Sequence, residues 1–177
     1  CVYCTQMPLS PQQRDVVQTI LTWLSKGNRQ TLTLGGYAGT GKTTVLAALR
    51  FVLAQKRPTW KVAFAAYTGK ATQVLAHKLK KIPLDLSQDN ISTLHSLLYS
   101  PIEDKQGQVA GWRRRETIPY SLIVVDEASM VTREIWQDLI RLGVPILAVG
   151  DHGQLPPIGE SLNLMKEPDL ILTEIHR

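Results

Sequence analysis

The sequence predicts an α/β fold in which a parallel β-sheet is flanked by helices and carries a small β-hairpin insertion. Three observations support this prediction. An apolar, β-prone segment at residues 31–34 runs through a glycine-rich turn into an amphipathic helix. Further apolar runs at residues 61–68 and 121–125 alternate with helical patterns, as buried parallel strands do. Residues 99–119 interrupt this alternation with polar residues and glycines, which favours an inserted hairpin.

The glycine-rich turn has the sequence of a phosphate-binding P-loop. Residues 36–43, GYAGTGKT, satisfy the pattern GxxxxGK[ST], and the strand before it and the helix after it supply the setting that the motif requires. Glycines let the backbone fold tightly with N–H groups facing an anion, and the positive end of the following helix favours phosphate. Lys42 would reach the terminal phosphates, and the Thr43 hydroxyl would ligate Mg²⁺. The residues predicted to bind nucleotide here are Gly36, Ala38, Gly39, Thr40, Gly41, Lys42, Thr43 and Thr44.

Composition narrows the class of protein. The chain has 177 residues, enough for one domain with a sizeable core, and 20 Lys+Arg against 15 Asp+Glu, a balance compatible with a polyanionic partner. No apolar run is long enough to cross a bilayer, and we expect a soluble, cytoplasmic protein without a membrane partner. The only cysteines, Cys1 and Cys4, form a single CxxC pair in a predicted tail at residues 1–8. One pair is half of a zinc site at best, so we expect incidental thiols.

The first predicted helix spans residues 8–26. Ser10 is placed as its N-cap, Pro11 as its first residue, and Gly27 ends it. A second strand at residues 61–68 leads into Thr68-Gly69-Lys70, which opens another helix with small polar groups and a lysine. This turn suits an anion, although an ordinary strand-to-helix turn would look similar.

Residues 90–98 have apolar residues at helical spacing behind several candidate N-caps. The hairpin predicted for residues 99–119 has its turn near residues 105–108 and a basic run beside Trp112 that begins at Arg113. This segment is either a solvated surface excursion or a surface that grips phosphates and stacks a base.

The run SLIVVDE at residues 121–127 is a buried strand that ends in two carboxylates. Mg²⁺ chemistry beside a P-loop needs an acid at this place, so we assign the metal to Asp126 and the polarisation of an attacking water to Glu127. A helix is predicted at residues 132–142.

The last part of the chain is predicted to add two strands. The strand at residues 145–151 is followed by a rigid loop at residues 152–159, where Gln154 can sense a terminal phosphate through its amide. A fifth strand at residues 170–175 brings Arg177 to the site.

Five of these segments together resemble the first RecA-like domain of a superfamily 1 DNA helicase of the RecD and Dda group. The segments are GGYAGTGKTT, TGKAT, STLH, VVDEASM and GDHGQLPPIG, which resemble motifs I, Ia, Ib, II and III in that order. The resemblance implies a RecA-like ATP-binding domain at residues 9–98 and 120–177. It also implies that residues 99–119 form the small domain whose hairpin acts as a pin at a duplex junction.

The resemblance also implies roles for single residues. Gln13 would read adenine, Gln154 would couple the γ-phosphate to DNA, and Arg177 would contact the γ-phosphate. Single-stranded DNA would run past Thr68, Lys70, Thr93 and His95, and the residue pattern of the hairpin adds Trp112 and Arg113.

We therefore predict an ATP-binding motor domain of an ATP-dependent helicase that uses Mg²⁺ and moves on single-stranded DNA. The resemblance implies 5′-to-3′ movement and work in repair, recombination or replication beside nuclease or replication subunits. The chain ends before motifs V and VI, so we expect a second RecA-like domain in a longer gene product, and weak hydrolysis without unwinding by this chain alone. Two alternatives are another P-loop ATPase, such as a clamp-loader relative or nucleotide kinase, and a nucleotide-gated DNA-binding module without catalysis.

Overall fold

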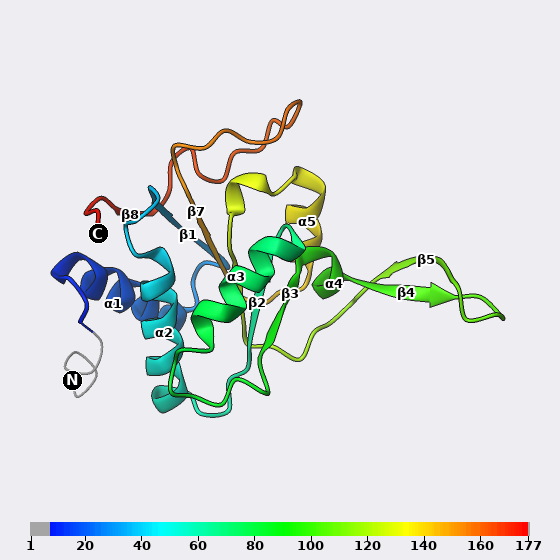
Figure 1. The fold of residues 1–177 in the computed structure, drawn as a ribbon, viewed down its shortest axis with the longest axis horizontal. Coiled ribbons are helices and arrows are strands. Elements are labelled where there is room, and N and C mark those ends of the chain that lie inside the picture. Colours follow the sequence, from blue (N-terminus) through cyan, green and yellow to red (C-terminus); the bar gives the residue numbers. More distant parts are fainter. Residues whose placement is uncertain (1–7, 177) are drawn as a thin grey trace.

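The computed structural model describes residues 8–176, which form a six-stranded parallel sheet with helices on both faces (Figure 1). The strand order is β3-β2-β6-β7-β1-β8, and every pair in the sheet is parallel. Parallel strands direct all their carboxyl ends to one edge, where ligands bind in open α/β sheets. The strands are β1 (Thr31–Gly36), β2 (Val62–Ala66), β3 (Asn90–Thr93), β6 (Leu122–Val125), β7 (Ile146–Gly150) and β8 (Leu170–Leu172).

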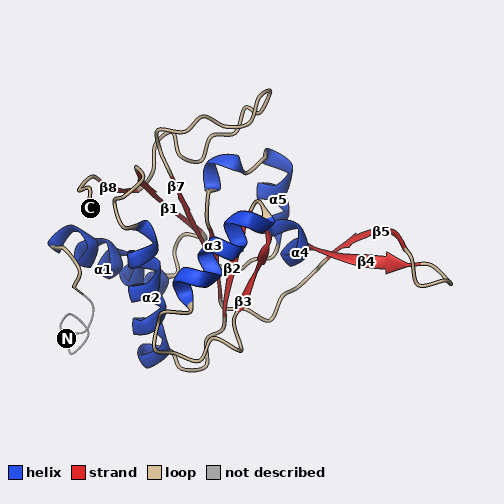
Figure 2. Ribbon diagram, in the orientation of Figure 1, coloured by secondary structure: helices blue, strands red, loops and turns tan. Residues whose placement is uncertain are grey.

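The helices cover the two faces of the sheet in two groups, α1 to α3 on one and α4 and α5 on the other (Figure 2). Alternate residues of β2 show this, because Val62 and Phe64 pack with the first group while Ala63 and Ala65 pack with the second. A sheet covered on both faces explains why its strands are apolar throughout. The helices are α1 (Pro11–Lys26), α2 (Lys42–Lys56), α3 (Gly69–Leu79), α4 (Leu94–Leu98) and α5 (Arg133–Arg141), with a 3₁₀ helix, η2 (Ala128–Met130).

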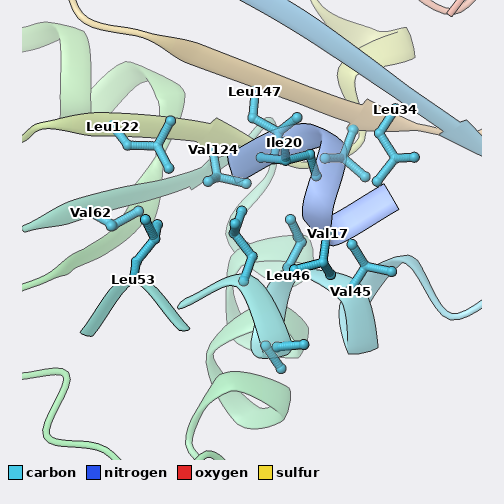
Figure 3. Close-up of a cluster of buried hydrophobic side chains, with 14 of the residues drawn as sticks. Val17, Ile20, Leu34, Val45, Leu46, Leu53, Val62, Leu122, Val124 and Leu147 are labelled. Carbon is cyan, nitrogen blue, oxygen red and sulfur yellow. The ribbon is translucent and has the colours of Figure 1, made fainter. Parts of the chain in front are cut away.

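The larger part of the core lies under α1 and α2 (Figure 3). Ile20 of α1 and Leu46 of α2 are almost completely buried against strand residues such as Leu147. Burying one such side chain contributes about 1.5–3 kcal/mol. This packing fixes the start of α2, and hence the glycine turn before it, against the sheet.

Capping confirms the predicted ends of the helices. Ser10 and Gln13 form a capping box at the start of α1, and Gly27 ends that helix with a left-handed backbone at φ 61°. Thr68 caps α3 and Thr132 caps α5, each through its side-chain oxygen. No helix within residues 8–176 is both long and apolar enough to span a membrane.

The prediction for residues 90–98 was partly wrong. Only Leu94–Leu98 is helical, while residues 90–93 form the edge strand β3, so the sheet has six strands instead of five. Asn90 to Thr93 pair in parallel with Ala63 to Ala66 of β2. This partner is distant in sequence, and the pairing decides the conformation of a short segment whose spacing also fits a helix. Strand β8 also ends earlier than predicted, at Leu172.

The inserted hairpin is present as predicted and projects from the body of the molecule (Figure 1). Strands β4 (Tyr99–Glu103) and β5 (Val109–Arg114) are antiparallel, and the Asp104 carboxylate accepts hydrogen bonds from the N–H groups of Gln106 and Gln108 in the turn. At its base the Tyr99 hydroxyl donates to Asp138 of α5, which also pairs with Arg114. Burial, and then the Asp138 carboxylate, raise the pKa of Tyr99 to about 12. These contacts join the hairpin to the body.

Candidate nucleotide-binding site

A cleft of about 1040 Å³ opens at the carboxyl edge of the sheet, where the loops after β1, β2, β6 and β7 meet. It contains many of the predicted residues, drawn from segments that are far apart in the sequence. Those that line it are Ala38, Gly39, Gly41, Lys42, Thr43, Thr44, Thr68, Lys70, Asp126, Glu127 and Gln154.

The glycine turn between β1 and α2 has the backbone that a phosphate cradle requires. Gly39 and Gly41 have φ angles of 82° and 80°, a left-handed conformation that favours glycine. Thr40 closes the turn, because its backbone N–H and its hydroxyl both donate to the Tyr37 carbonyl, at 3.2 and 2.7 Å. The N-cap of α2 makes no side-chain hydrogen bond, and residues of its first turn line the cleft, so free N–H groups there can donate to an anion.

Lys42 lies over this turn. Its Nζ donates to the carbonyl oxygens of Gly36 at 2.6 Å and Tyr37 at 3.1 Å. Burial lowers the pKa of Lys42, and the carboxylates of Asp151 and Asp126 oppose that shift. The ammonium group is therefore held at the cradle by weak carbonyl partners that a phosphate oxygen can replace.

Asp126 and Glu127 lie side by side at the end of β6. Burial raises the pKa of Asp126, and this is opposed by the Glu127 N–H, which donates to Asp126 Oδ1 at 2.9 Å, and by Lys42. Glu127 is exposed, and its φ of 51° is the only positive value of a non-glycine residue within residues 8–176. A left-handed glutamate costs backbone energy, and such strain is typical of functional sites.

The oxygen atoms of Asp126 and Thr43 suit Mg²⁺ as ligands. Within residues 8–176 no three His, Cys, Asp or Glu side chains are arranged to hold a metal ion. Mg²⁺ bound with a nucleotide needs only one or two protein ligands, because phosphate oxygens and waters complete its shell. A desolvated carboxylate at Asp126, with the Thr43 hydroxyl on the same cleft, matches that requirement.

Asp126→Asn should stabilise the free protein at neutral pH. Because the folded state raises the pKa of Asp126, it binds that proton more tightly than the unfolded state, and the stability of the wild type falls as pH rises through the folded pKa. Asparagine removes this loss. Urea unfolding at pH 4.5 and pH 7.5 should show an advantage for the variant that grows with pH. Asp15→Asn, at an exposed site on α1, is the control. An advantage that shrinks with pH would contradict the assignment.

Gln154 is connected to the segment that follows Glu127. The Ser129 hydroxyl donates to Gln154 Oε1 at 3.1 Å, so the loops after β6 and β7 touch beside the cleft. The loop after β7 is closed by Asp151, whose Oδ1 accepts from the Gly153 N–H and whose carbonyl accepts from the Gln154 N–H. Gln154 thus lines the same cleft as the carboxylate pair, and its role as a sensor of the terminal phosphate stays a prediction.

Three charged residues of the cleft, Asp151, Lys78 and Lys81, were missed by the sequence analysis. Asp151 and Lys78 both line it, and both act electrostatically on Lys42. Asp151 carries a signal that could have been used, because it is a carboxylate at the end of a buried strand, as Asp126 is. Lys78 and Lys81 carry none, since Lys78 lies in the last turn of α3 and Lys81 just after the helix, where basic residues are common for reasons of helix stability.

Gln13 has a structural position beneath the P-loop. Its side chain is buried, its Oε1 accepts from the Ser10 N–H at 2.9 Å, and its Nε2 lies where a β-carbon on Gly41 would come within 2.2 Å. The adenine contact stays a prediction. The neighbouring Gln12, which was not singled out, accepts from the N–H groups of Thr173 and Glu174.

The chain after β8 returns to the P-loop. The N–H of His176 donates to the Gly39 carbonyl at 2.8 Å. The predicted site residue Arg177 lies outside the described residues, as do Cys1 and Cys4, and the expectations for them stay predictions.

Gly41→Ala should destabilise the protein and abolish nucleotide binding. A β-carbon there needs an unfavourable backbone at φ 80° and would meet Gln13 Nε2 at 2.2 Å. Gly143→Ala is a matched control, because it carries the same kind of strain at φ 70° with nothing within 4 Å. We expect Gly143→Ala to cost about 1 kcal/mol and Gly41→Ala clearly more, by urea unfolding. Equal losses would refute the role of Gln13 under the loop.

The six residues predicted to bind DNA fall into two groups. Thr68 and Lys70 lie at the start of α3 and line the nucleotide cleft. Thr93 caps α4, and the His95 ring lies between the rings of Tyr99 and Trp112, with centroids at 4.9 and 4.5 Å. Trp112 is 53% exposed, and Arg113 is exposed beside it. Because β2 and β3 are adjacent, both groups lie along the same edge of the sheet.

Known proteins share sequence with most of this chain. The sequence model of one family, described as AAA domain, matches residues 8–177. The RecBCD enzyme subunit RecD of Mycobacterium tuberculosis is 33% identical over 137 residues, which cover 71% of this chain and 24% of that protein. The ATP-dependent RecD2 DNA helicase of Deinococcus radiodurans is 32% identical over 179 residues, 96% of this chain and 22% of that protein. The chain thus spans about a quarter of the length of these relatives.

Solved structures share the fold. The Pif1 helicase from Candida albicans has a TM-score of 0.58 at 24% identity and covers 95% of this chain and 40% of its own. Bacteroides Pif1 bound to ssDNA has a TM-score of 0.57 at 21% identity, with 95% of this chain and 42% of its own covered. The predicted RecA-like sheet is therefore confirmed.

Proposed function

We propose a function for this chain, which belongs to the AAA domain family and is a RecD-like motor domain of superfamily 1. The domain binds ATP and Mg²⁺ and drives movement on single-stranded DNA. The resemblance that the five motifs predicted is confirmed at the level of the family. The observation that carries the proposal is the cleft in which Lys42, Asp126 and Glu127 converge at the edge of the sheet.

The chemistry that this cleft supports is hydrolysis of a terminal phosphate by water. Lys42, already an N–H donor to two carbonyls, would transfer its hydrogen bonds to the β- and γ-phosphate oxygens and stabilise the charge that develops there. Glu127, exposed beside Asp126, would accept a proton from the attacking water. Thr43 and Asp126 would hold Mg²⁺, which neutralises phosphate charge when bound. Arg177 would add a second cation at the γ-phosphate.

DNA would follow the sheet edge past the ends of β2 and β3. Lys70 and Arg113 offer charge for the backbone, and Trp112, with its exposed ring, offers a face on which a base can stack. The hairpin, which Asp138 anchors to the body, would serve as the pin at a duplex junction, with residues 9–98 and 120–177 as the motor domain.

The proposal extends to the whole protein. A second RecA-like domain would close on the nucleotide and supply the missing half of the site, because a ratchet on DNA needs two domains that move relative to each other. We propose movement in the 5′-to-3′ direction, action in the cytoplasm in DNA repair, recombination or replication, and partner subunits with nuclease or replication functions. The relatives support the last point, since RecD is named as a subunit of the RecBCD enzyme.

Binding of a fluorescent ATP analogue tests the nucleotide part of this proposal. We expect binding that depends on Mg²⁺ and is displaced by ATP and ADP, with AMP at least about 100-fold weaker because it lacks the phosphates that Lys42 contacts. Lys42→Ala should remove most of the affinity. Displacement by AMP as strong as by ATP would show that the cleft does not recognise the terminal phosphates and would overturn the motor assignment.

A further inference from the structure

Tyr37 is a half-exposed aromatic residue inside the P-loop, and its ring rests on the loop that follows β7. The ring centroids of Tyr37 and His152 are 4.2 Å apart with the planes tilted by 47°. These residues are separated by more than a hundred positions in the sequence, and their contact joins the phosphate cradle to the loop that carries Gln154.

The loop after β7 leaves room for the Tyr37 ring. A β-carbon on Gly153 would lie 2.6 Å from Tyr37 Cε1, so a glycine at this position is what lets the ring approach. In the partner ring of this contact, His152 Nδ1 is buried and has no hydrogen-bond partner within residues 8–176. Packing against Tyr37 is therefore a contact that positions the His152 ring, with no hydrogen bond at Nδ1 to do so.

The backbone carbonyl of Tyr37, which a side-chain substitution leaves in place, also lies in the P-loop turn. Its oxygen accepts from Lys42 Nζ at 3.1 Å and from the Thr40 hydroxyl at 2.7 Å. The Lys42 ammonium group, which would move to a phosphate, is therefore hydrogen-bonded to Tyr37, whose ring packs against His152. Two positions beyond His152, Gln154 accepts from Ser129 in the segment that follows Glu127.

We propose that Tyr37 is a positioning residue, whose ring transmits the occupancy of the phosphate cradle to residues 151–154. When Lys42 turns from the Tyr37 carbonyl to a phosphate oxygen, the turn loses one of its hydrogen bonds and adjusts, and the ring shifts the His152 contact with it. This inference rests on the proposed function, because it requires that the cradle binds nucleotide. The coupling would pass through one direct contact between the P-loop and the loop after β7.

Hydrogen–deuterium exchange of residues 151–159 tests the proposal on the full chain, with and without a non-hydrolysable ATP analogue and Mg²⁺. In the wild type we expect the analogue to change exchange in this loop by at least about 5-fold, the lower range of coupling between sites. In Tyr37→Ala the change should fall below about 2-fold while the analogue still binds, because Lys42 and the glycines remain. Tyr37→Phe keeps the ring and should restore the response.

Gly153→Ala provides an independent test of the contact. In the wild-type background the added β-carbon should displace the ring and remove the exchange response. In a Tyr37→Ala background only the approach of the β-carbon to Asp151 Oδ1, at 3.2 Å, would remain, so the further effect should be much smaller and the two changes should not add. Ile158→Ala alters a fully exposed side chain of the same loop and is the control that should respond as the wild type does.

The possible failures can be told apart. If the analogue does not bind the wild type, the proposed function fails and the relay fails with it. If the analogue binds and the loop responds equally in Tyr37→Ala, only the relay is overturned. Additive effects of Gly153→Ala and Tyr37→Ala would also overturn it, since each change would then act on a different contact.

Discussion

Replacing Lys42 with alanine is expected to lower ATP turnover by about 10²- to 10³-fold in a protein that joins this chain to its second motor domain, the loss typical of one transition-state donor. Its Nζ lies at the P-loop carbonyls with Asp126 and Asp151 as charged neighbours, so the substitution removes the ammonium group that would contact the phosphates. Affinity for ATP should fall as well, because the ammonium contacts phosphate before and during the reaction.

Steady-state kinetics with phosphate release as the signal measures this effect. Lys56→Ala is the matched control, because Lys56 is an exposed lysine at the opposite end of the same helix, α2. The control should retain turnover and stability close to the wild type. Turnover retained in Lys42→Ala would refute the assignment of the phosphate cradle.

Glu127→Gln is expected to produce a different defect, with turnover lowered by about 10²- to 10⁴-fold and ATP affinity nearly unchanged. Glutamine keeps the size of the side chain and the strained backbone at φ 51° but cannot accept a proton from water. The variant should therefore trap bound ATP, whereas Lys42→Ala should fail to bind it well.

Single-turnover hydrolysis together with equilibrium binding separates the two defects. Glu134→Gln, at an exposed glutamate of α5, is the control for loss of one negative charge. If Glu127→Gln weakened ATP binding as much as Lys42→Ala does, Glu127 would be a ligand of the nucleotide or metal and not the base.

The features that the sequence predicted correctly are those that local chemistry determines. Three glycines around Lys42 need a tight turn wherever they occur, and a capped start at Ser10 depends only on the residues next to it. The carboxylates at Asp126 and Glu127 follow an apolar run that forms a buried strand in almost any α/β context.

The features that the sequence did not reveal depend on partners far along the chain. Residues 90–93 become a strand because β2 pairs with them, and Lys78 enters the cleft because α3 packs beside α2. The contact between Tyr37 and His152 forms only when the loops after β1 and β7, on adjacent strands, come together. The resemblance predicts that Gln13 contacts adenine, and its burial beside Gly41 could not be read from the motif.

The central claim is that nucleotide and DNA binding are coupled in this domain, and binding of a labelled oligo-dT, followed by fluorescence anisotropy, tests it most directly. The measurement compares no nucleotide, ADP, and a non-hydrolysable ATP analogue with Mg²⁺, at two salt concentrations. We predict an affinity that falls with salt and shifts by at least about 5-fold with nucleotide state, and that Lys42→Ala removes the shift. Binding that is absent, or that depends on salt but ignores nucleotide, would contradict the account.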